Sequence, residues 1–343
     1  MSEAFLSSLE KAFRCHIYGV KPKRNVYQVR TNRGSWIVKS YRERERAYWV
    51  TQLAQTLNDQ GFYKTVHYVS SEDGQQVYPF ERRFYTVMKT IDGQEATYSS
   101  DYDIRKAATT LAQFHQAAHG IPFMTESHSG SFPLLDKWDA RVESFDKITK
   151  RIARKGPENR LEQLVAQMMD DVKEGAYETL EQMRKLPFER EMYHAYREGT
   201  LAHRDVASHN FLITSKGNCY LIDLDTVHSD MQLVDLAQFM SRMLLLQGYQ
   251  MNAYIDALHA YMKVRHLSDT QIRLLTALLQ FPDNFLREVT GLYGKRSGYK
   301  VRGVTQLLQV KRRFWANRKE FLRQAKLTMQ YSSANSNLYE YSR

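Results

Sequence analysis

The chain has 343 residues, 43% of them hydrophobic and 25% charged, with 16 glycines and 7 prolines, a composition that excludes a disordered or fibrous protein. Its net charge of +11 permits an anionic partner, while the two distant cysteines, Cys15 and Cys219, exclude a disulfide framework or a cysteine-based zinc site. Glu3 stands where a signal peptide would be basic, and no run of about 18 apolar residues follows, so we expect synthesis in the cytoplasm and no membrane crossing.

The first part of the chain predicts short strands with a single helix among them. The first two strands flank Asn32-Arg33-Gly34, where glycine can supply a positive φ, so they predict a hairpin. A helix is expected over 42–60, ending at Gly61. This order predicts a small antiparallel sheet that carries one helix. The expected strands are 25–31, 35–41, 63–69, 76–80 and 84–91.

After Asp92-Gly93 the pattern becomes mainly helical. Apolar residues recur at helical spacing from Ile104 to Ala118, and the charged segment 137–198 predicts two or three long helices. A strand pair is expected over 210–214 and 219–223, followed by helices over 233–246, 251–265, 268–281 and 303–327. We therefore expect an N-lobe over 1–92, a C-lobe over 93–329 and a polar tail over 330–343.

The stretch from 201 to 227 carries the chemistry. His203, Asp205 and Asn210 form the pattern H-x-D-x-x-x-x-N, and Asp223 follows at the end of the next predicted strand. Phosphoryl transfer requires a carboxylate beside the acceptor hydroxyl, and oxygen ligands for a Mg²⁺ ion on the nucleotide phosphates. Asp205 can supply the first, and Asn210 with Asp223 the second. We interpret His203 as a hydrogen-bonding residue that fixes the loop rather than as a base.

With these residues the chain resembles the protein-kinase-like superfamily. Within it, the chain is most similar to the aminoglycoside phosphotransferase and choline kinase branch, and there to the bacterial spore-coat kinase-like family of the CotS type. The run 111–120 resembles the LAxFHxAxxG helix of the spore-coat group, and 235–237 resembles the DLA that follows the metal-binding aspartate. The resemblance implies an α+β, two-lobed fold, with a small antiparallel-sheet N-lobe carrying one helix and a larger, mainly helical C-lobe.

The resemblance also implies roles for residues outside the loop. Lys39 would grip the α- and β-phosphates of ATP, with Glu45, or less plausibly Glu43, as its ion-pair partner. The backbone of the hinge strand would bind adenine at Met88, Lys89 and Thr90. The implied activity is an ATP- and Mg²⁺-dependent phosphotransferase that acts on the hydroxyl of an unidentified small molecule, with a place in the spore coat.

Other features depart from typical protein kinases. Only twelve positions separate Asp223 from Asp235, which leaves no room for a long activation segment and disfavours a protein kinase. The first hairpin has no G-x-G-x-x-G motif, so phosphate contacts would come from backbone N–H groups and from Lys21, Lys23 or Arg24. We interpret Asp225 as a hydrogen-bonding residue rather than a second metal ligand, and Asp235 as a buried carboxylate that braces the loop.

The positive charge is concentrated near the C-terminus. Residues 291–330 contain eleven lysines and arginines against one acid, Glu320. Because the aromatic residues there follow helical spacing, we favour a solvated helix face over nucleic-acid contact, and keep RNA binding as a lesser alternative. The main alternative to an enzyme is an inactive kinase-like scaffold of the spore coat whose basic C-terminal helix docks on an acidic protein partner.

Overall fold

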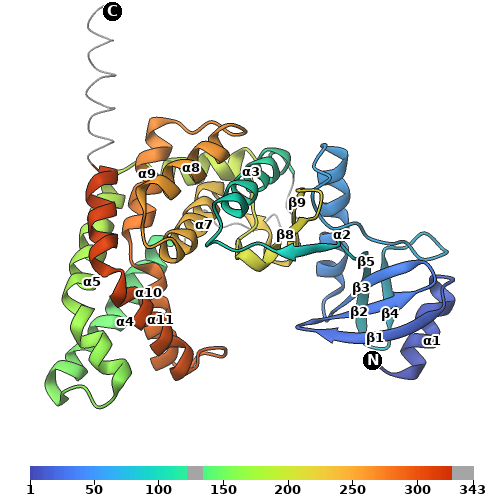
Figure 1. Cartoon of the computed structure of the whole chain (residues 1–343), viewed down its shortest axis with the longest axis horizontal. Coiled ribbons are helices and arrows are strands. Elements are labelled where there is room, and N and C mark those ends of the chain that lie inside the picture. The colour runs from blue at the N-terminus through green and yellow to red at the C-terminus, as the bar shows by residue number, and fades with distance from the viewer. Residues whose placement is uncertain (122–133, 327–343) are drawn as a thin grey trace, which may run out of the picture. The chain divides into compact units, whose positions relative to one another are not determined.

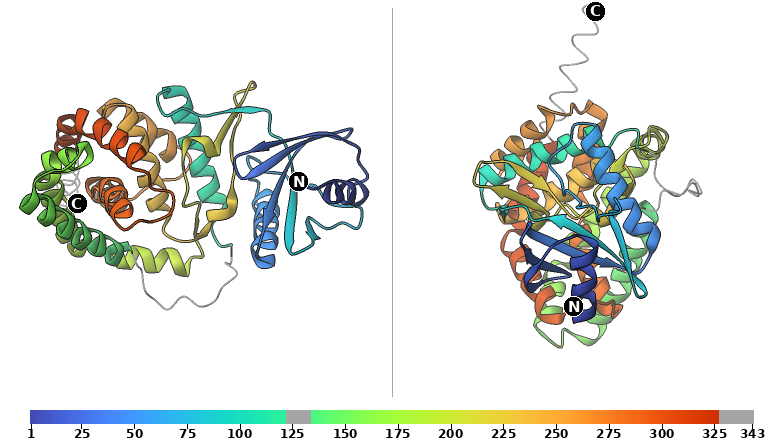
Figure 2. Two further views of the ribbon diagram at one scale, coloured as in Figure 1. Left: turned by 90° about the horizontal axis from the view of Figure 1, so that it is seen from below. Right: turned by 90° about the vertical axis from the view of Figure 1, so that its right-hand side faces the viewer.

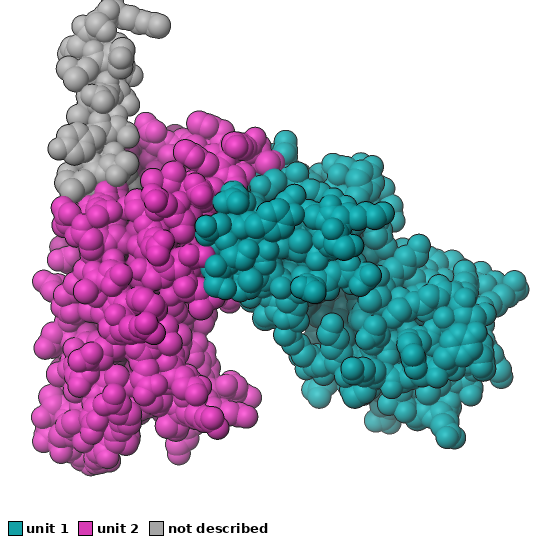
Figure 3. All heavy atoms as spheres, viewed as in Figure 1, with its two compact units in different colours: residues 1–124, 199–229 teal, residues 125–198, 230–343 magenta. Residues whose placement is uncertain are grey.

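The computed structural model describes residues 1–121 and 134–326 (Figure 1). The chain forms two compact units (Figure 3): unit 1 comprises Met1–Met124 and Gly199–Ser229, and unit 2 comprises Thr125–Glu198 and Asp230–Arg343. Unit 1 therefore contains both the N-terminal sheet and the motif-bearing stretch that begins near residue 201. The predicted polar tail lies outside the described residues.

Unit 1 contains the predicted antiparallel sheet. Its five strands lie in the order β1-β2-β3-β5-β4, and helices α1 (Glu3–Ala12) and α2 (Arg44–Asp59) flank it (Figure 2). Helix α1 was not predicted; it is capped by the Ser2 side chain and buries Phe5 and Leu9 in a core with β2, β3 and β5. The strands are β1 (Ile17–Lys23), β2 (Val26–Thr31), β3 (Gly34–Tyr41), β4 (Val77–Phe80) and β5 (Arg83–Lys89).

Strand β3 separates the core from the functional face of the sheet. Side chains alternate across a strand, and Trp36 and Val38 are buried in the core cluster shared with α1. Ile37, Lys39 and Tyr41 take the intervening positions and line a cavity on the opposite face. The β2–β3 hairpin was predicted correctly, and its turn places Gly34 at φ +110°, a conformation that glycine tolerates best.

The predicted strand over 63–69 was wrong. Strand β4 pairs with Arg83–Thr86 of β5, which leaves only the last residues of that edge for the 63–69 segment. The segment makes a single bridge there, between Tyr68 and Met88. Its earlier residues turn away instead, and Lys64 O accepts a hydrogen bond from Leu221 N at 2.9 Å.

The motif-bearing part of unit 1 is built on short strands and helix α3 (Asp101–Ala117). Strands β6 (Gly93–Glu95), β8 (Phe211–Thr214) and β9 (Cys219–Leu221) form one antiparallel sheet. Strand β7 (Leu201–Ala202) pairs with β10 (His228–Ser229), so the two ends of the 201–229 segment are held together. The predicted helix over 104–118 and the β8–β9 hairpin are confirmed.

Gly93 lies where β6 approaches β8 closely. A Cβ atom at Gly93 would lie 3.1 Å from the carbonyl oxygen of Ile213, so Gly93→Ala should force the strands apart. We expect a loss of about 1–3 kcal/mol in the free energy of unfolding, measured by chemical denaturation. Gly303→Ala is the matched control, because its Cβ would meet nothing within 4 Å in a helix; it should stabilise by up to about 1 kcal/mol. Equal effects from both substitutions would contradict this packing argument.

Unit 2 is helical in its described residues, and no helix there or in unit 1 is long and apolar enough to cross a membrane. The prediction of two or three helices over 137–198 is confirmed, since three lie there. Helix α10 was not predicted, because Pro282 suggested a stop, whereas it is the N-cap of that helix. The helix predicted over 303–327 is interrupted by a turn at Phe314. The helices are α4 (Leu134–Lys155), α5 (Arg160–Lys185), α6 (Phe188–Arg197), α7 (Gln232–Leu246), α8 (Met251–Met262), α9 (Asp269–Gln280), α10 (Asp283–Tyr293) and α11 (Val301–Arg313).

Lys311 of α11 is a buried cation, 8% exposed, with no ion-pair partner among the described residues. Burial is the main cause that lowers the pKa of Lys311 from 10.5 to about 7, and Arg318 and Arg287 lower it further. Between pH 7 and pH 10.5 the Lys311 amine is protonated in the unfolded chain but largely neutral in the folded chain. The free energy of unfolding should therefore rise with pH across this window.

We therefore expect Lys311→Met to raise the Tm at pH 7 and to flatten the rise in stability with pH, as measured by thermal unfolding over a pH series. Lys295→Met, at an exposed lysine of the same unit, is the control and should leave the pH dependence unchanged. A lower Tm for Lys311→Met at pH 7 would mean that the buried amine is stabilising, against this expectation.

Candidate functional site

The loop after β7 has a constrained backbone. Arg204 and Asp223 adopt positive φ values of 66° and 63°, which cost energy for residues other than glycine and persist where the surroundings impose them. Tyr98 of the segment before α3 donates its buried hydroxyl to Val206 O at 2.8 Å and so braces the loop. Strained backbone of this kind concentrates at functional sites.

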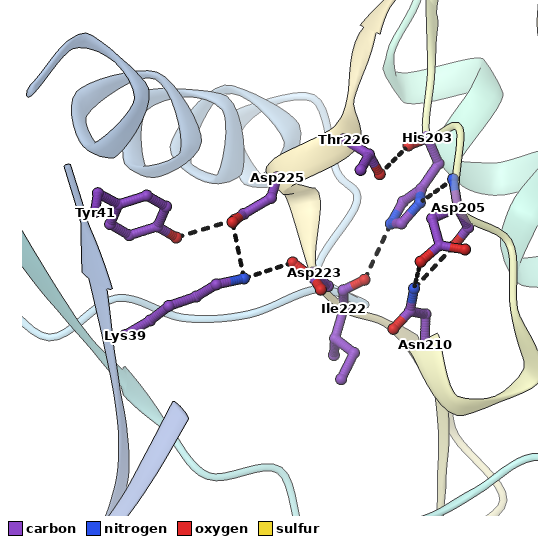
Figure 4. A network of polar contacts seen from close by, with 9 residues as sticks. All are labelled: Lys39, Tyr41, His203, Asp205, Asn210, Ile222, Asp223, Asp225 and Thr226. Atoms are coloured by element: carbon purple, nitrogen blue, oxygen red, sulfur yellow. Dashed lines mark hydrogen bonds and ion pairs between the residues drawn. The ribbon is translucent and has the colours of Figure 1, made fainter. Parts of the chain in front are cut away.

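His203 is fully buried and fixes the loop from within (Figure 4). Its Nε2 lies 3.0 Å from Ile222 O, and its Nδ1 lies 3.4 Å from the backbone nitrogen of Asp205. Because a carbonyl oxygen can only accept, Nε2 carries the proton and donates, which leaves Nδ1 as the acceptor. Thr226 also donates its hydroxyl to His203 O at 2.7 Å. These contacts agree with a structural role for the imidazole.

Asp205 and Asn210 are joined directly. Asn210 Nδ2 donates to Asp205 O at 2.8 Å and to Asp205 Oδ2 at 3.1 Å, which fixes the orientation of the amide. Asn210 is buried, and neither of these two bonds uses its Oδ1. Ile222 N donates to Asn210 O at 2.9 Å, so the loop is also tied to the residue before Asp223.

Lys39 reaches the same site from strand β3. Its Nζ lies 2.6 Å from Asp223 Oδ1 and 2.9 Å from Asp225 Oδ2 (Figure 4). Tyr41, two positions further along β3 and on the same face, donates its hydroxyl to Asp225 Oδ1 at 3.0 Å. The short 3₁₀ turn over Leu224–Thr226 sets the two carboxylates side by side.

The ion pairs between Lys39 and the two aspartates keep Lys39 and Asp223 charged. Burial by itself lowers the pKa of Lys39, but Asp225 and Asp223 outweigh it, so the net pKa is raised. Burial raises the pKa of Asp223, but Lys39 outweighs this effect and the net pKa is lowered. Burial, with Tyr68 and Asp225 nearby, raises the pKa of Tyr41, which therefore remains a hydrogen-bond donor. Lys39 and Asp223 are thus both ionised at neutral pH.

A cavity of about 350 Å³ within unit 1 unites most of the predicted site residues, and its volume lies in the range of small-ligand sites. Glu45 is not among them: it is an exposed residue in the first turn of α2 and does not line the cavity. The predicted residues that do line it are Lys39, Met88, Lys89, Thr90, Asp205, Asn210 and Asp223.

The hinge strand has fewer unused backbone donors than expected. Lys89 N–H donates to His67 O at 2.9 Å, and Thr90 N–H donates to Ser35 O at 3.0 Å. Ile91 also lines the cavity, and its N–H has no partner among the described residues. Hydrogen bonds from this strand to a ligand would therefore come from carbonyl groups and from Ile91 N–H.

The β1–β2 turn occupies the position at which protein kinases have a glycine-rich loop, a motif that this sequence lacks. It is a tight turn between Lys23 and Val26, with Arg24 at φ 52°. Lys23 and Arg24 line the cavity, whereas Lys21 does not. Arg24 pairs with Glu95 of β6 at 3.0 Å, so a second ion pair lies on the wall of the cavity.

The oxygen groups fit a metal that arrives with a ligand rather than a dedicated metal cage. Among the described residues, no group of three or more His, Cys, Asp or Glu side chains is placed to hold a metal. Mg²⁺ is typically bound by one or two protein oxygens together with phosphates and water. Asn210 Oδ1, left open by its amide contacts, and the partly exposed Asp223 carboxylate are suitable ligands of this kind.

Sequence reasoning missed Tyr41 and Glu95 as site residues. Tyr41 shares the period-2 face of Lys39, so its position on that face could have been read from the predicted strand. Glu95 could not have been found in this way, because its place depends on β6 pairing with β8. Asp235 is fully buried at the start of α7 in unit 2.

The sequence matches a known protein family along most of its length. The profile of a family described as "Spore coat putative kinase YutH" matches residues 7–325. No curated protein sequence matches the chain.

Solved structures share the fold at low identity. An aminoglycoside phosphotransferase from Alicyclobacillus acidocaldarius has 19% identity and a TM-score of 0.87, with 96% of this chain and 97% of that chain covered. The spectinomycin phosphotransferase APH(9)-Ia, solved with ADP and spectinomycin, has 14% identity and a TM-score of 0.64, with 95% and 98% covered. The choline kinase LicA from Streptococcus pneumoniae has 14% identity and a TM-score of 0.50, with 93% and 97% covered. The fold is therefore protein-kinase-like, as predicted.

Proposed function

The chain belongs to the spore coat putative kinase YutH family, and on this premise we propose that it is an ATP- and Mg²⁺-dependent phosphotransferase that acts on the hydroxyl of a small molecule. The observation that carries the proposal is the gathering of Asp205, Asn210 and Asp223 with Lys39 around one cavity. Phosphoryl transfer depends mainly on such fixed charge and positioning. We also propose that the protein works at the spore coat, as the family description suggests.

The nucleotide would occupy the cavity of unit 1. Adenine would lie against the hinge strand and take its hydrogen bonds from the carbonyls of 89–90 and from Ile91 N–H. Lys39 would neutralise phosphate charge, and Asn210 Oδ1 with the Asp223 carboxylate would hold Mg²⁺. The bound ion supplies charge stabilisation to the transferring phosphoryl group.

Asp205 would act on the acceptor. Its carboxylate would orient the acceptor hydroxyl and take its proton as the acceptor oxygen bonds to the γ-phosphorus, while the bond from that phosphorus to the β–γ bridging oxygen breaks and ADP leaves. The amide of Asn210 would hold the carboxylate in place through Oδ2. A carboxylate oriented by an amide in this way needs no base from His203, whose ring nitrogens are both engaged by the backbone.

Two observations support a small acceptor over a protein. Between Asp223 and the start of α7 at Gln232, the chain is too short for a long activation segment. The structures of similar fold include enzymes named for aminoglycosides, spectinomycin and choline. We therefore propose an alcohol-bearing small molecule as the acceptor class.

The proposal is tested by transfer of labelled γ-phosphate from MgATP. The purified full chain would be incubated with separate panels of amino alcohols, aminoglycosides, inositols and sugars, and labelled products separated by chromatography. Labelled product from one panel, dependent on Mg²⁺, is the expected result. Nucleotide binding without transfer to any panel, under conditions where a related phosphotransferase is active, would contradict the enzymatic role.

A second candidate function, an inactive scaffold that docks an acidic protein, has one specific observation in its favour. The sequence has no acid from 289 to 319, and six exposed cations there have no ion-pair partner among the described residues: Lys295, Arg296, Lys300, Arg302, Arg312 and Arg313. The scaffold predicts salt-sensitive binding of an acidic peptide such as poly-glutamate, weakened by Arg302→Gln and Arg313→Gln and unaffected by Asp205→Asn. Equal affinity for an RNA of the same charge would indicate nonspecific polyanion binding.

A further inference from the structure

We propose that Asp225 is a positioning residue that anchors Lys39, in the place where related kinases are expected to use a helix glutamate. In this arrangement the lysine anchor and the metal-binding carboxylate belong to one short turn, with separate tasks for Asp225 and Asp223. The proposal rests on the proposed function for its catalytic meaning, but the anchor itself is a property of the folded chain.

The two carboxylates of the turn are engaged differently. Both oxygens of Asp225 already have protein partners, since Oδ2 lies 2.9 Å from Lys39 Nζ and Oδ1 accepts from Tyr41 at 3.0 Å. Asp223 Oδ1 pairs with Lys39, and the Asp223 carboxylate also accepts a hydrogen bond from the Asp225 backbone N–H, but this side chain is 43% exposed against 29% for Asp225. Asp223 is therefore the better placed of the two to take a ligand, and Asp225 the better placed to hold the lysine.

Tyr41 makes Asp225 a fixed anchor rather than a mobile counter-ion. The tyrosine is 6% exposed on β3, two residues beyond Lys39, so the same strand supplies both the cation and the hydroxyl that orients its partner. The carboxylate is thus clamped between two donors of one strand face (Figure 4). One partner on each oxygen leaves Asp225 about two of its roughly four acceptor sites, and the two contacts fix the direction in which those sites point.

The turn that carries the two aspartates is fixed by a buried leucine. Asp223 adopts the left-handed conformation and caps a 3₁₀ turn whose first residue, Leu224, is 2% exposed. Leu224 lies between the two aspartates in the sequence and is buried, and both carboxylates, Asp223 and Asp225, contact Lys39 Nζ. This explains why a costly backbone conformation is retained at Asp223.

Helix α2 takes no part in holding the lysine. Glu45 is exposed in its first turn, Glu43 is its N-cap residue without a side-chain cap bond, and neither lines the cavity. In protein kinases the strand lysine pairs with a helix glutamate, and the position of that helix controls activity. Helix α2 packs against β3 and against the 3₁₀ turn that carries Asp225, but it supplies no carboxylate to Lys39, so a movement of α2 would not by itself take a partner away from the lysine.

The anchor is tested first without nucleotide, by double-mutant cycles of chemical unfolding. Lys39→Met and Asp225→Asn should be coupled by about tenfold in the unfolding equilibrium constant. Lys39→Met and Glu45→Gln should be additive. Additivity of Lys39→Met with Asp225→Asn, or coupling with Glu45→Gln instead, would overturn the proposal. Since these measurements need no ligand, they decide the anchor even if the proposed function fails.

The division of labour is tested by the affinity for a fluorescent ATP analogue in EDTA and in saturating Mg²⁺. Asp225→Asn should weaken binding about tenfold in EDTA and keep the wild-type gain from Mg²⁺. Asp223→Asn should show the reverse: the affinity for the ATP analogue in EDTA should stay at the wild-type value, and the increase in affinity that Mg²⁺ gives the wild-type chain should be lost. Tyr41→Phe should act in the same direction as Asp225→Asn, but more weakly. Loss of the Mg²⁺ gain in Asp225→Asn, with unchanged EDTA affinity, would make Asp225 a metal ligand and refute the proposal.

Discussion

An Asp205→Asn variant is expected to transfer phosphate about 100 to 10,000 times more slowly than the wild-type chain, the range that a general base contributes. The amide cannot take the proton of the acceptor hydroxyl, yet it has nearly the same shape and can still accept from Asn210. Nucleotide affinity should therefore stay close to the wild-type value. The measurement is kcat with the acceptor identified by labelled γ-phosphate, together with the Kd for MgATP.

The matched control for this change is Asp92→Asn. Asp92 is an exposed carboxylate of the same unit that does not line the cavity, so the same chemical change there should leave kcat unaltered. Full activity in Asp205→Asn would refute the role of Asp205 as the base. A parallel loss of MgATP affinity and kcat would point instead to a collapse of the loop, because Asn210 depends on Asp205 for its orientation.

An Asp223→Asn variant is expected to lose the stabilisation that MgATP gives the wild-type chain. A ligand at 100 times its Kd stabilises by about 2.7 kcal/mol, which would appear as a rise in Tm. Because Lys39 keeps the pKa of Asp223 low, the carboxylate is charged at neutral pH and can bind a cation. The amide has no charge to offer. The measurement is the Tm with ATP in Mg²⁺ and with ATP in EDTA, for both chains.

The apo Tm serves as the internal control for this substitution. Lys39 retains Asp225 as a partner when Asp223 is neutral, so the apo variant should unfold within a few degrees of the wild-type chain. An Mg²⁺-dependent rise in Tm that is equal in both chains would mean that the metal binds elsewhere. No rise in the wild-type chain at millimolar MgATP would argue for the scaffold.

Much of the site could be predicted because it is local in sequence. Asp205 and Asn210 belong to one loop, and the β8–β9 hairpin returns the chain to Asp223 within a few residues. Spacing alone therefore places the three oxygen groups close together. The strand of Lys39 was also recognisable, since hairpins of β-branched and aromatic residues with a glycine turn have a clear pattern.

The partners of Lys39 were harder to predict because they depend on long-range packing. Glu45 lies six residues from Lys39, while the observed partners lie more than 180 residues away. Their approach depends on the turn at Leu224 being pinned in the core and on Tyr41 sharing the face of Lys39. Neither is a property of a short sequence window.

The wrong or missing elements of the fold have similar causes. The 63–69 segment has strand-like residues, but β4 occupies most of the edge that it needs. Helix α1 carries only two buried residues, Phe5 and Leu9, and its stability comes from the sheet core rather than from its own periodicity. Pro282 ends one helix and begins the next, and the sequence pattern supports either role.

The central claim is that Asn210 and Asp223 hold a divalent ion on the phosphates of a nucleotide in the cavity of unit 1. The most direct test is a crystal structure with Mn²⁺ and a non-hydrolysable ATP analogue, with the metal located by anomalous scattering. The account predicts one anomalous peak in contact with oxygens of Asn210, Asp223 and the phosphates, with Lys39 still paired to Asp225. A nucleotide bound elsewhere, or a metal on neither side chain, would contradict it.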